Sequence, residues 1–159
     1  MKLITNPKEA ARLAMEQEDA NWKFRVFLKR VDLGMDELDA IVHRHYKEVS
    51  AQIDCRKCGN CCRESRPVLQ ADDVKMLARG LSTSGEIVTK RFLITDEDGD
   101  IVFNKLPCPL LTGKLCSVYE YRPGDCRSFP HLHNGIEPPT YGFLTRFPAL
   151  WPILINELS

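Results

Sequence analysis

The residues of this sequence that suggest chemistry are seven cysteines, four of which fall in the run Cys55-Arg56-Lys57-Cys58-Gly59-Asn60-Cys61-Cys62. A C-x-x-C turn brings two sulfurs to one metal ion, and a following glycine lets the chain turn back tightly. Overlapping C-x-x-C-x-x-C spacing also holds iron–sulfur clusters. We therefore expect a centre of zinc ions, iron ions or an iron–sulfur cluster. Its predicted ligands are Cys55, Cys58, Cys61, Cys62, Cys108, Cys116 and Cys126.

The adjacent pair Cys61-Cys62 raises the question of how many metals are bound. Neighbouring side chains tend to diverge, so we expect the two thiols to serve different metals or different purposes. Seven thiols and one histidine would complete two four-ligand sites. His131 is the predicted eighth ligand, with His133 as the alternative. An exposed or merely hydrogen-bonded role is equally open for either histidine.

Two other interpretations of the cysteines carry less weight. Unliganded buried thiols would pack as small hydrophobic groups, but clustered thiols beside Gly, Asn and Arg do not resemble a core. Thiol exchange by Cys55 and Cys58 would require the βαβ context of a thioredoxin-like motif, which is missing. Basic residues also flank the thiols, and among them we expect Arg127, next to Cys126, to offset thiolate charge.

The composition limits the class of protein. The chain has 159 residues, 43% of them hydrophobic, and its 22 basic and 22 acidic residues give a formal net charge of zero. This balance argues against general nucleic-acid or anionic-membrane binding, and no apolar run is long enough to span a membrane. The N-terminus does not resemble a signal peptide. We therefore expect a cytoplasmic protein, in which an odd number of clustered cysteines favours metal ligands over disulfides.

Helices are expected to precede the cysteines. Asn6 and Pro7 resemble a helix start, and apolar spacing predicts one helix over 7–31 and a second over 35–53, after a break at Gly34. These helices are expected to form an N-terminal helical hairpin spanning 1–53. The cysteine-cluster region is placed at 54–139, and a C-terminal segment, 140–159, is expected to pack on the domain.

The cysteine-cluster region itself is expected to be only partly regular. The sequence predicts helices over 71–81 and 84–93 and a β-hairpin over 94–103, closed by an acidic turn. A calcium loop is excluded there because Ile101 and Pro107 occupy the positions that need Gly and Glu. Irregular loops are expected over 107–139, and a short helix over 149–158. The predicted fold is a compact single domain, mainly α with a small β-hairpin and an irregular Cys-rich metal-binding lobe.

Two blocks of the sequence also match the pattern of a known family. They are Cys55-x-x-Cys58-Gly59-x-Cys61-Cys62 with Cys108-Pro109-Leu110, and Cys116-Ser117-Val118-Tyr119-Glu120-x-Arg122-Pro123-x-x-Cys126-Arg127-x-Phe129-Pro130. Together they resemble the YkgJ-like cysteine-cluster proteins, described as zinc- or iron-chelating domains of the CxxCxxCC type, which include small bacterial members. The resemblance covers about half of the chain and implies metal chelation by the seven cysteines.

Three functions agree with these features. The first is a metal-binding protein with a redox or modification-related role. The second is an enzyme component for redox chemistry or methyl transfer with an open metal site. Methyl transfer is suggested by the similarity to flagellin lysine N-methylases, although no glycine-rich nucleotide loop supports an S-adenosylmethionine site. The third is an adaptor with purely structural zinc, whose N-terminal helices bind a protein partner.

Overall fold

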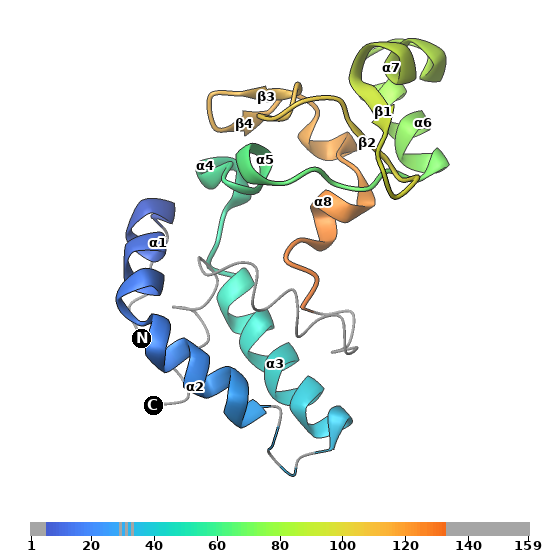
Figure 1. Cartoon of the computed structure of the whole chain (residues 1–159). Helices are drawn as coiled ribbons and strands as arrows, with labels where there is room; N and C mark the ends of the chain where they lie inside the picture. The colour runs from blue at the N-terminus through green and yellow to red at the C-terminus, as the bar shows by residue number, and fades with distance from the viewer. Residues whose placement is uncertain (1–5, 29, 31, 33, 133–159) are drawn as a thin grey trace. The chain divides into compact units, whose positions relative to one another are not determined.

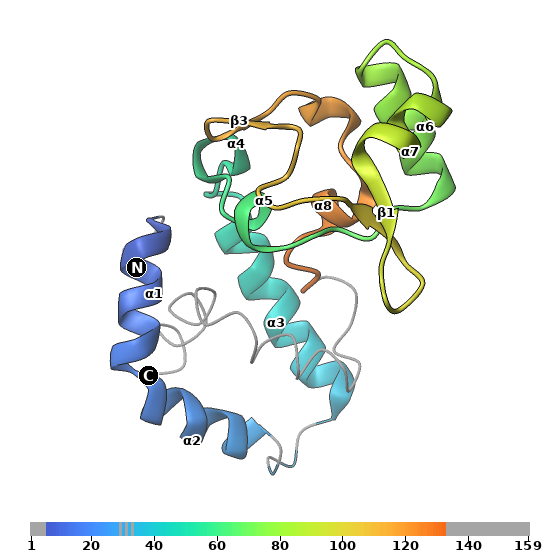
Figure 2. The ribbon, with the colours of Figure 1, turned by 45° about the horizontal axis from the view of Figure 1, so that its top comes forward.

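The computed structural model describes residues 6–132, except 29, 31 and 33. The chain divides into two compact units. One is Cys55–His131, and the described residues before Cys55 belong to the other. Figures 1 and 2 show the ribbon from two directions. The predicted helix over 149–158 and the C-terminal segment 140–159 lie outside the described residues.

The N-terminal unit is helical. Asn6 caps its first helix, because the Asn6 side chain accepts a 3.0 Å hydrogen bond from the Lys8 amide and proline follows at the first helical position. This confirms the predicted helix start. The helices are α1 (Pro7–Glu16), α2 (Glu18–Leu28) and α3 (Met35–Ser50).

The predicted single helix over 7–31 is wrong, because the structure ends α1 at Glu16 and begins α2 at Glu18. Gln17 leaves the helical conformation with φ −105° and ψ 19°. Two acidic residues then occupy the first turn of α2, where the positive end of a helix dipole favours them. Across the break, the buried Asn21 amide donates a 3.2 Å hydrogen bond to the Ala14 carbonyl. Periodicity alone did not reveal this side-chain bond.

The cysteine-bearing unit combines short helices with two small hairpins. Its elements are α4 (Cys55–Cys58), α5 (Cys61–Glu64), α6 (Ala71–Gly80), α7 (Gly85–Phe92), β1 (Leu93–Thr95), β2 (Ile101–Phe103), β3 (Leu111–Thr112), β4 (Leu115–Cys116), the 3-10 turn η1 (Tyr119–Tyr121) and α8 (Gly124–Ser128). The predicted mainly α class with a small β-hairpin is therefore confirmed. The second hairpin, β3–β4, falls in a stretch where the sequence predicts only loops and turns.

The predicted helices and hairpin after the first cysteines are confirmed. The Ser84 hydroxyl accepts a 3.3 Å hydrogen bond from the Ile87 amide at the start of α7. The acidic turn between β1 and β2 closes on one side chain, because Asp96 Oδ1 accepts from the amides of Asp98 and Asp100 at 3.1 and 2.9 Å. This arrangement explains the run of acidic residues as a hairpin turn, as predicted.

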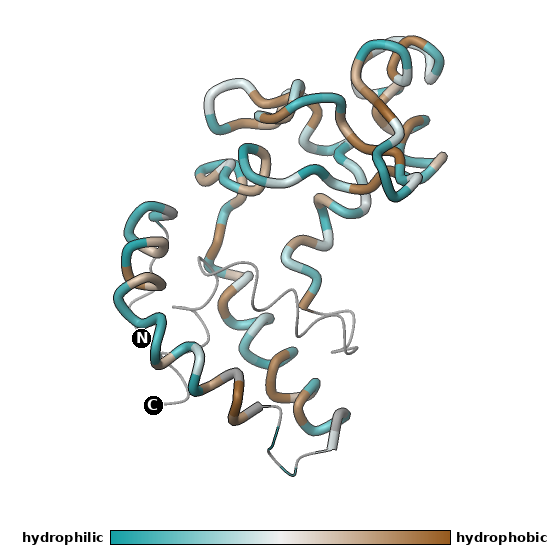
Figure 3. The backbone as a smooth tube through the Cα atoms, in the orientation of Figure 1, coloured by the Kyte–Doolittle hydropathy of each residue, from teal (hydrophilic) through white to brown (hydrophobic). Residues whose placement is uncertain are grey.

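The core of this unit lies where α6, α7 and the β1–β2 hairpin meet, as the apolar stretches in Figure 3 show. Leu77 and Val88 are completely buried there, and Cys108 and Cys116 pack against its edge. A Cβ atom at Gly80 would lie 2.8 Å from the Tyr121 side chain, so α6 and η1 approach as closely as glycine allows. The core thus provides a rigid wall for two of the seven thiols. The other core members are Leu69, Ala78, Leu93, Phe103, Leu110 and Val118.

A membrane-spanning role finds no support among the helices that the structure describes. None of them, within residues 6–132 and apart from the three gaps, combines the length and apolar character needed to cross a bilayer.

Candidate metal centre

The first four cysteines lie on two single helical turns, α4 and α5, joined at Gly59 and Asn60. Gly59 has φ +63°, a conformation that strains other residues. A Cβ atom there would also lie 2.9 Å from the Lys114 carbonyl oxygen. Glycine is therefore required both by the turn and by the close approach of the β3–β4 hairpin.

Arg63 fastens this cysteine loop to the β3–β4 hairpin. Its guanidinium Nη1 donates a 2.7 Å hydrogen bond to the Gly59 carbonyl, and Nη2 donates to the Gly113 carbonyl at the hairpin turn. The two carbonyls are separated by more than fifty residues of sequence, so one side chain fixes two distant loops. The planar fork of arginine suits such a double contact better than lysine does.

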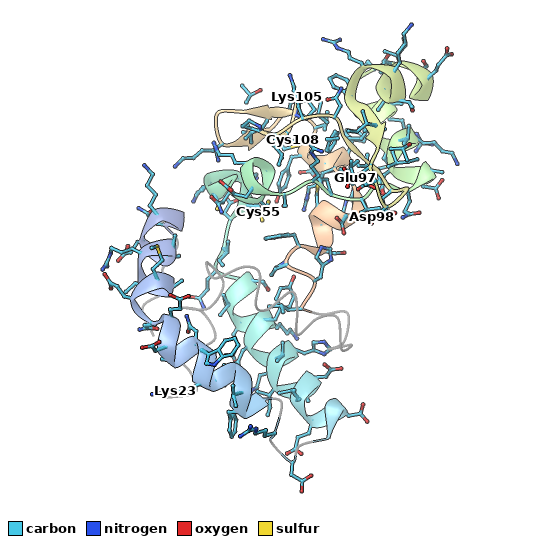
Figure 4. All side chains as sticks on the ribbon, in the orientation of Figure 1. Lys23, Cys55, Glu97, Asp98, Lys105 and Cys108 are labelled. Carbon is cyan, nitrogen blue, oxygen red and sulfur yellow. The ribbon has the colours of Figure 1, made fainter. Side chains whose placement is uncertain are left out.

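The later cysteines reach the first group by separate routes. The Cys108 amide donates a 2.7 Å hydrogen bond to the Cys62 carbonyl, which joins the two groups directly through the backbone. Cys116 lies on β4 and pairs with Leu111 on β3. Cys126 lies in the middle of α8. Figure 4 labels Cys55 and Cys108 among the side chains of this unit.

Two carboxylates hold α8, and with it Cys126, against α6 and the segment that precedes it. Asp73 Oδ1 accepts a 2.8 Å hydrogen bond from the Gly124 amide at the start of α8. Asp125 Oδ2 accepts one of 3.0 Å from the Val68 amide. Each bond links residues that are more than fifty positions apart in the sequence. Sequence patterns, which relate near neighbours in the chain, therefore did not indicate these contacts.

His131 lies beside α8 and is engaged with its neighbours. Its Nε2 atom lies 3.2 Å from Asp125 Oδ1, and its ring meets Phe129 edge to face with centroids 6.2 Å apart. The role of His131 as the eighth ligand stays a prediction. The alternative ligand, His133, lies outside the described residues.

Three basic side chains near the thiols make specific contacts. Arg127 donates to the carbonyls of Arg122 and Glu120 at 3.0 and 2.8 Å, so its guanidinium shapes the loop before Cys126. Arg122 stacks on the Tyr119 ring at 3.8 Å, and its charge favours the thiolate of Cys116. The charge of Arg63 similarly favours the thiolate of Cys62. The expected role of Arg127 in offsetting thiolate charge stays a prediction.

None of the seven cysteines forms a disulfide; Cys55 is exposed and the other six are half-buried. The sulfur atoms of Cys61 and Cys62 lie 4.0 Å apart. With zinc–sulfur bonds of about 2.3 Å, the edge of a tetrahedral site is about 3.8 Å. The expected divergence of this pair is thus not seen in the positions of the two sulfur atoms.

The pKa values of Cys61 and Cys62 shift in opposite directions. The hydrogen bond from Cys61 is the main reason why the pKa of Cys62 falls to about 7, with a further contribution from the charge of Arg63. The same hydrogen bond, followed by burial, raises the pKa of Cys61. The metal-free pair is therefore best described as a Cys61 thiol donating to a Cys62 thiolate.

The Cys62 thiolate is also the common neighbour of the later cysteines. Burial is the largest cause that raises the pKa of Cys108, to about 11, and it likewise raises the pKa of Cys116 and Cys126. The charge of Cys62 adds to the rise in all three. Since such repulsion requires proximity, Cys62 and these three thiols form one electrostatic group.

The donor set fits zinc or iron by its chemistry, because clustered thiolates are the ligands these metals use in sites of this kind. Among the side chains that the structure describes, no three His, Cys, Asp or Glu are already positioned to hold one ion together. The residues that would hold a metal are the group around Cys62, with Cys55 and Cys58 on the adjoining turn. Loading would draw the sulfurs together against their mutual repulsion.

Comparison with known proteins agrees with this donor chemistry. A family model described as "CxxCxxCC: Putative zinc- or iron-chelating domain" matches residues 54–142, which is more than half of the 159-residue chain and includes all seven cysteines. No curated protein and no solved structure shows a significant match. The chain belongs to the CxxCxxCC family of zinc- or iron-chelating domains.

Proposed function

We propose that this protein holds an iron–sulfur cluster, or zinc or iron ions, through its clustered cysteines and uses the loaded centre in a redox or modification-related role in the cytoplasm. The observation that carries the proposal is the 2.7 Å hydrogen bond from the Cys108 amide to the Cys62 carbonyl, which joins the two cysteine groups. The pKa directions of Cys108, Cys116 and Cys126 agree with Cys62 as their neighbour. These thiols come from α5, the loop before β3, β4 and α8, so folding assembles them from four places. A half-buried group of mutually repelling thiolates is stabilised when a cation binds it.

The protein's own residues supply the holding and the charge balance. The Arg63 fork and the Cys108–Cys62 backbone bond fix the two cysteine groups to each other. Arg63 and Arg122 place positive charge beside thiolates that would otherwise leave the loaded centre strongly negative. A bound iron–sulfur cluster would supply electron transfer, whereas a bound zinc ion would supply Lewis acidity or structural closure.

Anaerobic purification followed by iron, zinc and acid-labile sulfide analysis tests the proposal. Iron and sulfide in similar amounts, with broad visible absorption, identify a cluster. Zinc without sulfide identifies zinc ions. A chain that binds neither metal after reconstitution with iron and sulfide, or with zinc, would contradict metal binding.

The adaptor alternative keeps one specific observation in its favour. Large apolar side chains are exposed on the N-terminal helices: Met15 is 77%, Trp22 61% and Phe27 55% exposed. Exposed apolar side chains mark a protein-binding surface where they form one contiguous patch, and the adaptor alternative requires that these three do so. X-ray absorption spectroscopy of the zinc-loaded protein separates this alternative from an enzyme. Four sulfur ligands per zinc favour a closed structural site, and three sulfurs with one light atom favour an open catalytic site.

A further inference from the structure

A second candidate site lies outside the cysteines, where α7 ends and the chain leaves β2. A hollow of about 410 Å³ is lined there by Arg91, Phe92, Asn104, Lys105 and Pro109. Small-molecule sites in proteins typically measure a few hundred Å³ or more. The hollow adjoins the metal centre through the chain, since Pro109 comes directly after Cys108, and Figure 4 labels Lys105 and Cys108.

The charge of the lining is positive. Arg91 and Lys105 line the hollow, and in the part of the chain that the structure describes neither forms an ion pair. Cations are common in the last turn of a helix, where they offset the negative end of the dipole, and this could account for Arg91. It does not account for Lys105, which comes after β2 and belongs to no helix.

Asn104 binds the carbonyl groups at the C-terminal end of α7, whose negative dipole end the cations would otherwise offset. Its side-chain amide donates a 2.9 Å hydrogen bond to the Arg91 carbonyl, and its backbone amide donates one of 2.8 Å to the Phe92 carbonyl. Two of the terminal carbonyls of α7 are therefore capped. The charges of Arg91 and Lys105 remain available to a ligand.

The same bonds make the hollow rigid. They tie the residues after β2 to the end of α7, so two parts of the lining are joined by two hydrogen bonds. The Arg91 guanidinium lies 5.1 Å from the centre of the Phe92 ring, which restrains a side chain that is otherwise flexible. A restrained guanidinium loses less entropy when it binds a carboxylate or phosphate.

We propose that this hollow binds a small molecule that carries a phosphate or carboxylate group next to a flat apolar part. Arg91 and Lys105 receive the anionic group, the guanidinium through paired hydrogen bonds. Phe92 and Pro109 contact the apolar part. The site uses no cysteine as a ligand, so it stands independently of which metal the protein holds.

Titration of the isotope-labelled, full-length, metal-loaded protein with AMP, phenyl phosphate, benzoate and inorganic phosphate, monitored by NMR, tests this site. We expect saturable shifts at the Asn104 side-chain amide and at the Phe92 and Lys105 backbone amides with at least one of the aromatic anions. Inorganic phosphate alone should bind more weakly, because it makes no contact with Phe92 or Pro109. Equal affinity for inorganic phosphate, or no saturable shift with any aromatic anion at millimolar concentration, would overturn the proposal.

Substitutions then locate the site. Arg91→Gln and Lys105→Gln should each weaken binding roughly tenfold, the loss of one charge-assisted contact. Lys90→Gln is the matched control, because Lys90 is an exposed cation on the same helical turn that does not line the hollow. An equal loss in Lys90→Gln would show that only overall charge matters and would overturn the assignment. Unchanged metal content in all three variants shows that the fold is intact.

Discussion

The sulfur atoms of Cys61 and Cys62 lie 4.0 Å apart, close enough for the first thiol to donate a hydrogen bond to the second. This contact lowers the pKa of Cys62 to about 7 and makes Cys62 the thiolate of the pair in the metal-free protein. Cys62 also neighbours three further thiols, and its carbonyl accepts the Cys108 amide. It therefore occupies the centre of the cysteine group, whereas Cys55 is exposed at one end.

This difference predicts unequal effects of two serine substitutions. Cys62→Ser should remove most of the bound metal, because the thiolate that neighbours all three later cysteines is lost. Cys55→Ser should keep most of the metal and bind it less tightly. Metal per chain after anaerobic purification, and competition with a chelator of known affinity, measure both effects.

Both serine variants keep the size of the side chain, so each serves as the control for the other. If Cys55→Ser loses as much metal as Cys62→Ser, the central position of Cys62 is incorrect. Loss of folded structure in both would appear in the amide spectrum and would make metal-dependent folding the explanation instead.

A second pair of variants compares the cost of a side chain at Gly59 with its cost at Gly113. Gly59→Ala meets both a left-handed φ of +63° and a carbonyl oxygen 2.9 Å away, while Gly113→Ala meets a φ of +64° in open space. Gly113→Ala should lower the free energy of unfolding of the cysteine-bearing unit by about 1 kcal/mol. Gly59→Ala should lower it by at least about 2 kcal/mol, because backbone strain and collision add.

Urea unfolding monitored by the amide signals of β1 and β2 measures this difference. Tryptophan fluorescence is unsuitable, because Trp22 and Trp151 both lie outside Cys55–His131. Equal effects of the two alanines would mean that the approach of the hairpin to Gly59 contributes nothing.

A substitution at Arg63 can separate the effect of its hydrogen-bond geometry from the effect of its charge. Arg63→Lys keeps the positive charge beside Cys62 but loses the fork that joins the Gly59 and Gly113 carbonyls. We expect it to destabilise the unit by about 2 kcal/mol, the size of charge-assisted hydrogen bonds. Arg66→Lys is the control: Arg66 is exposed, and the change should stay within about 0.5 kcal/mol. The same urea experiment measures the free energy of unfolding of both variants. Equal values for the two lysine variants would show that Arg63 does not fasten the cysteine loop to the β3–β4 hairpin.

Local signals in the sequence account for much of this fold. Asn6 before Pro7, Ser84 before α7 and the acidic turn closed by Asp96 each bind their own backbone within a few residues, so the sequence alone contains both partners. The spacing of the cysteines likewise predicts thiol chemistry, and the family match agrees with it. Features of this kind are visible without a structure because their physics is local.

The features that the sequence did not reveal depend on partners far apart in the chain. Arg63 reaches Gly113, and Asp125 reaches Val68, through contacts that no spacing rule encodes. The break at Gln17 was missed for another reason: it is spanned by a hydrogen bond from the Asn21 side-chain amide to the Ala14 carbonyl, and periodicity treats Asn21 as one more polar residue.

The raised pKa values predict how the stability of the metal-free protein changes with pH. Unfolded thiols ionise near pH 8.5, whereas folded Cys61, Cys108, Cys116 and Cys126 keep their protons to higher pH, Cys108 to about 11. Above pH 8.5 the folded state therefore binds more protons, and stability falls as pH rises. Cys62, with a pKa of about 7, acts oppositely: its contribution is present above pH 8.5 and is lost as pH falls through 7.

Stability of the reduced, metal-free protein should therefore be highest near pH 8 and decline toward pH 10, by up to about 1.4 kcal/mol per pH unit for each retained proton. Urea midpoints of the cysteine-bearing unit between pH 6 and pH 10, with a chelator and a reductant present, measure the decline. Cys108→Ser should flatten it, because one of the thiols that resist ionisation is removed. Zinc-loaded protein should show little of it, since bound thiolates carry no proton to lose. A decline of the same slope in the wild-type protein, in Cys108→Ser and in the zinc-loaded form would assign it to groups outside the cysteine cluster.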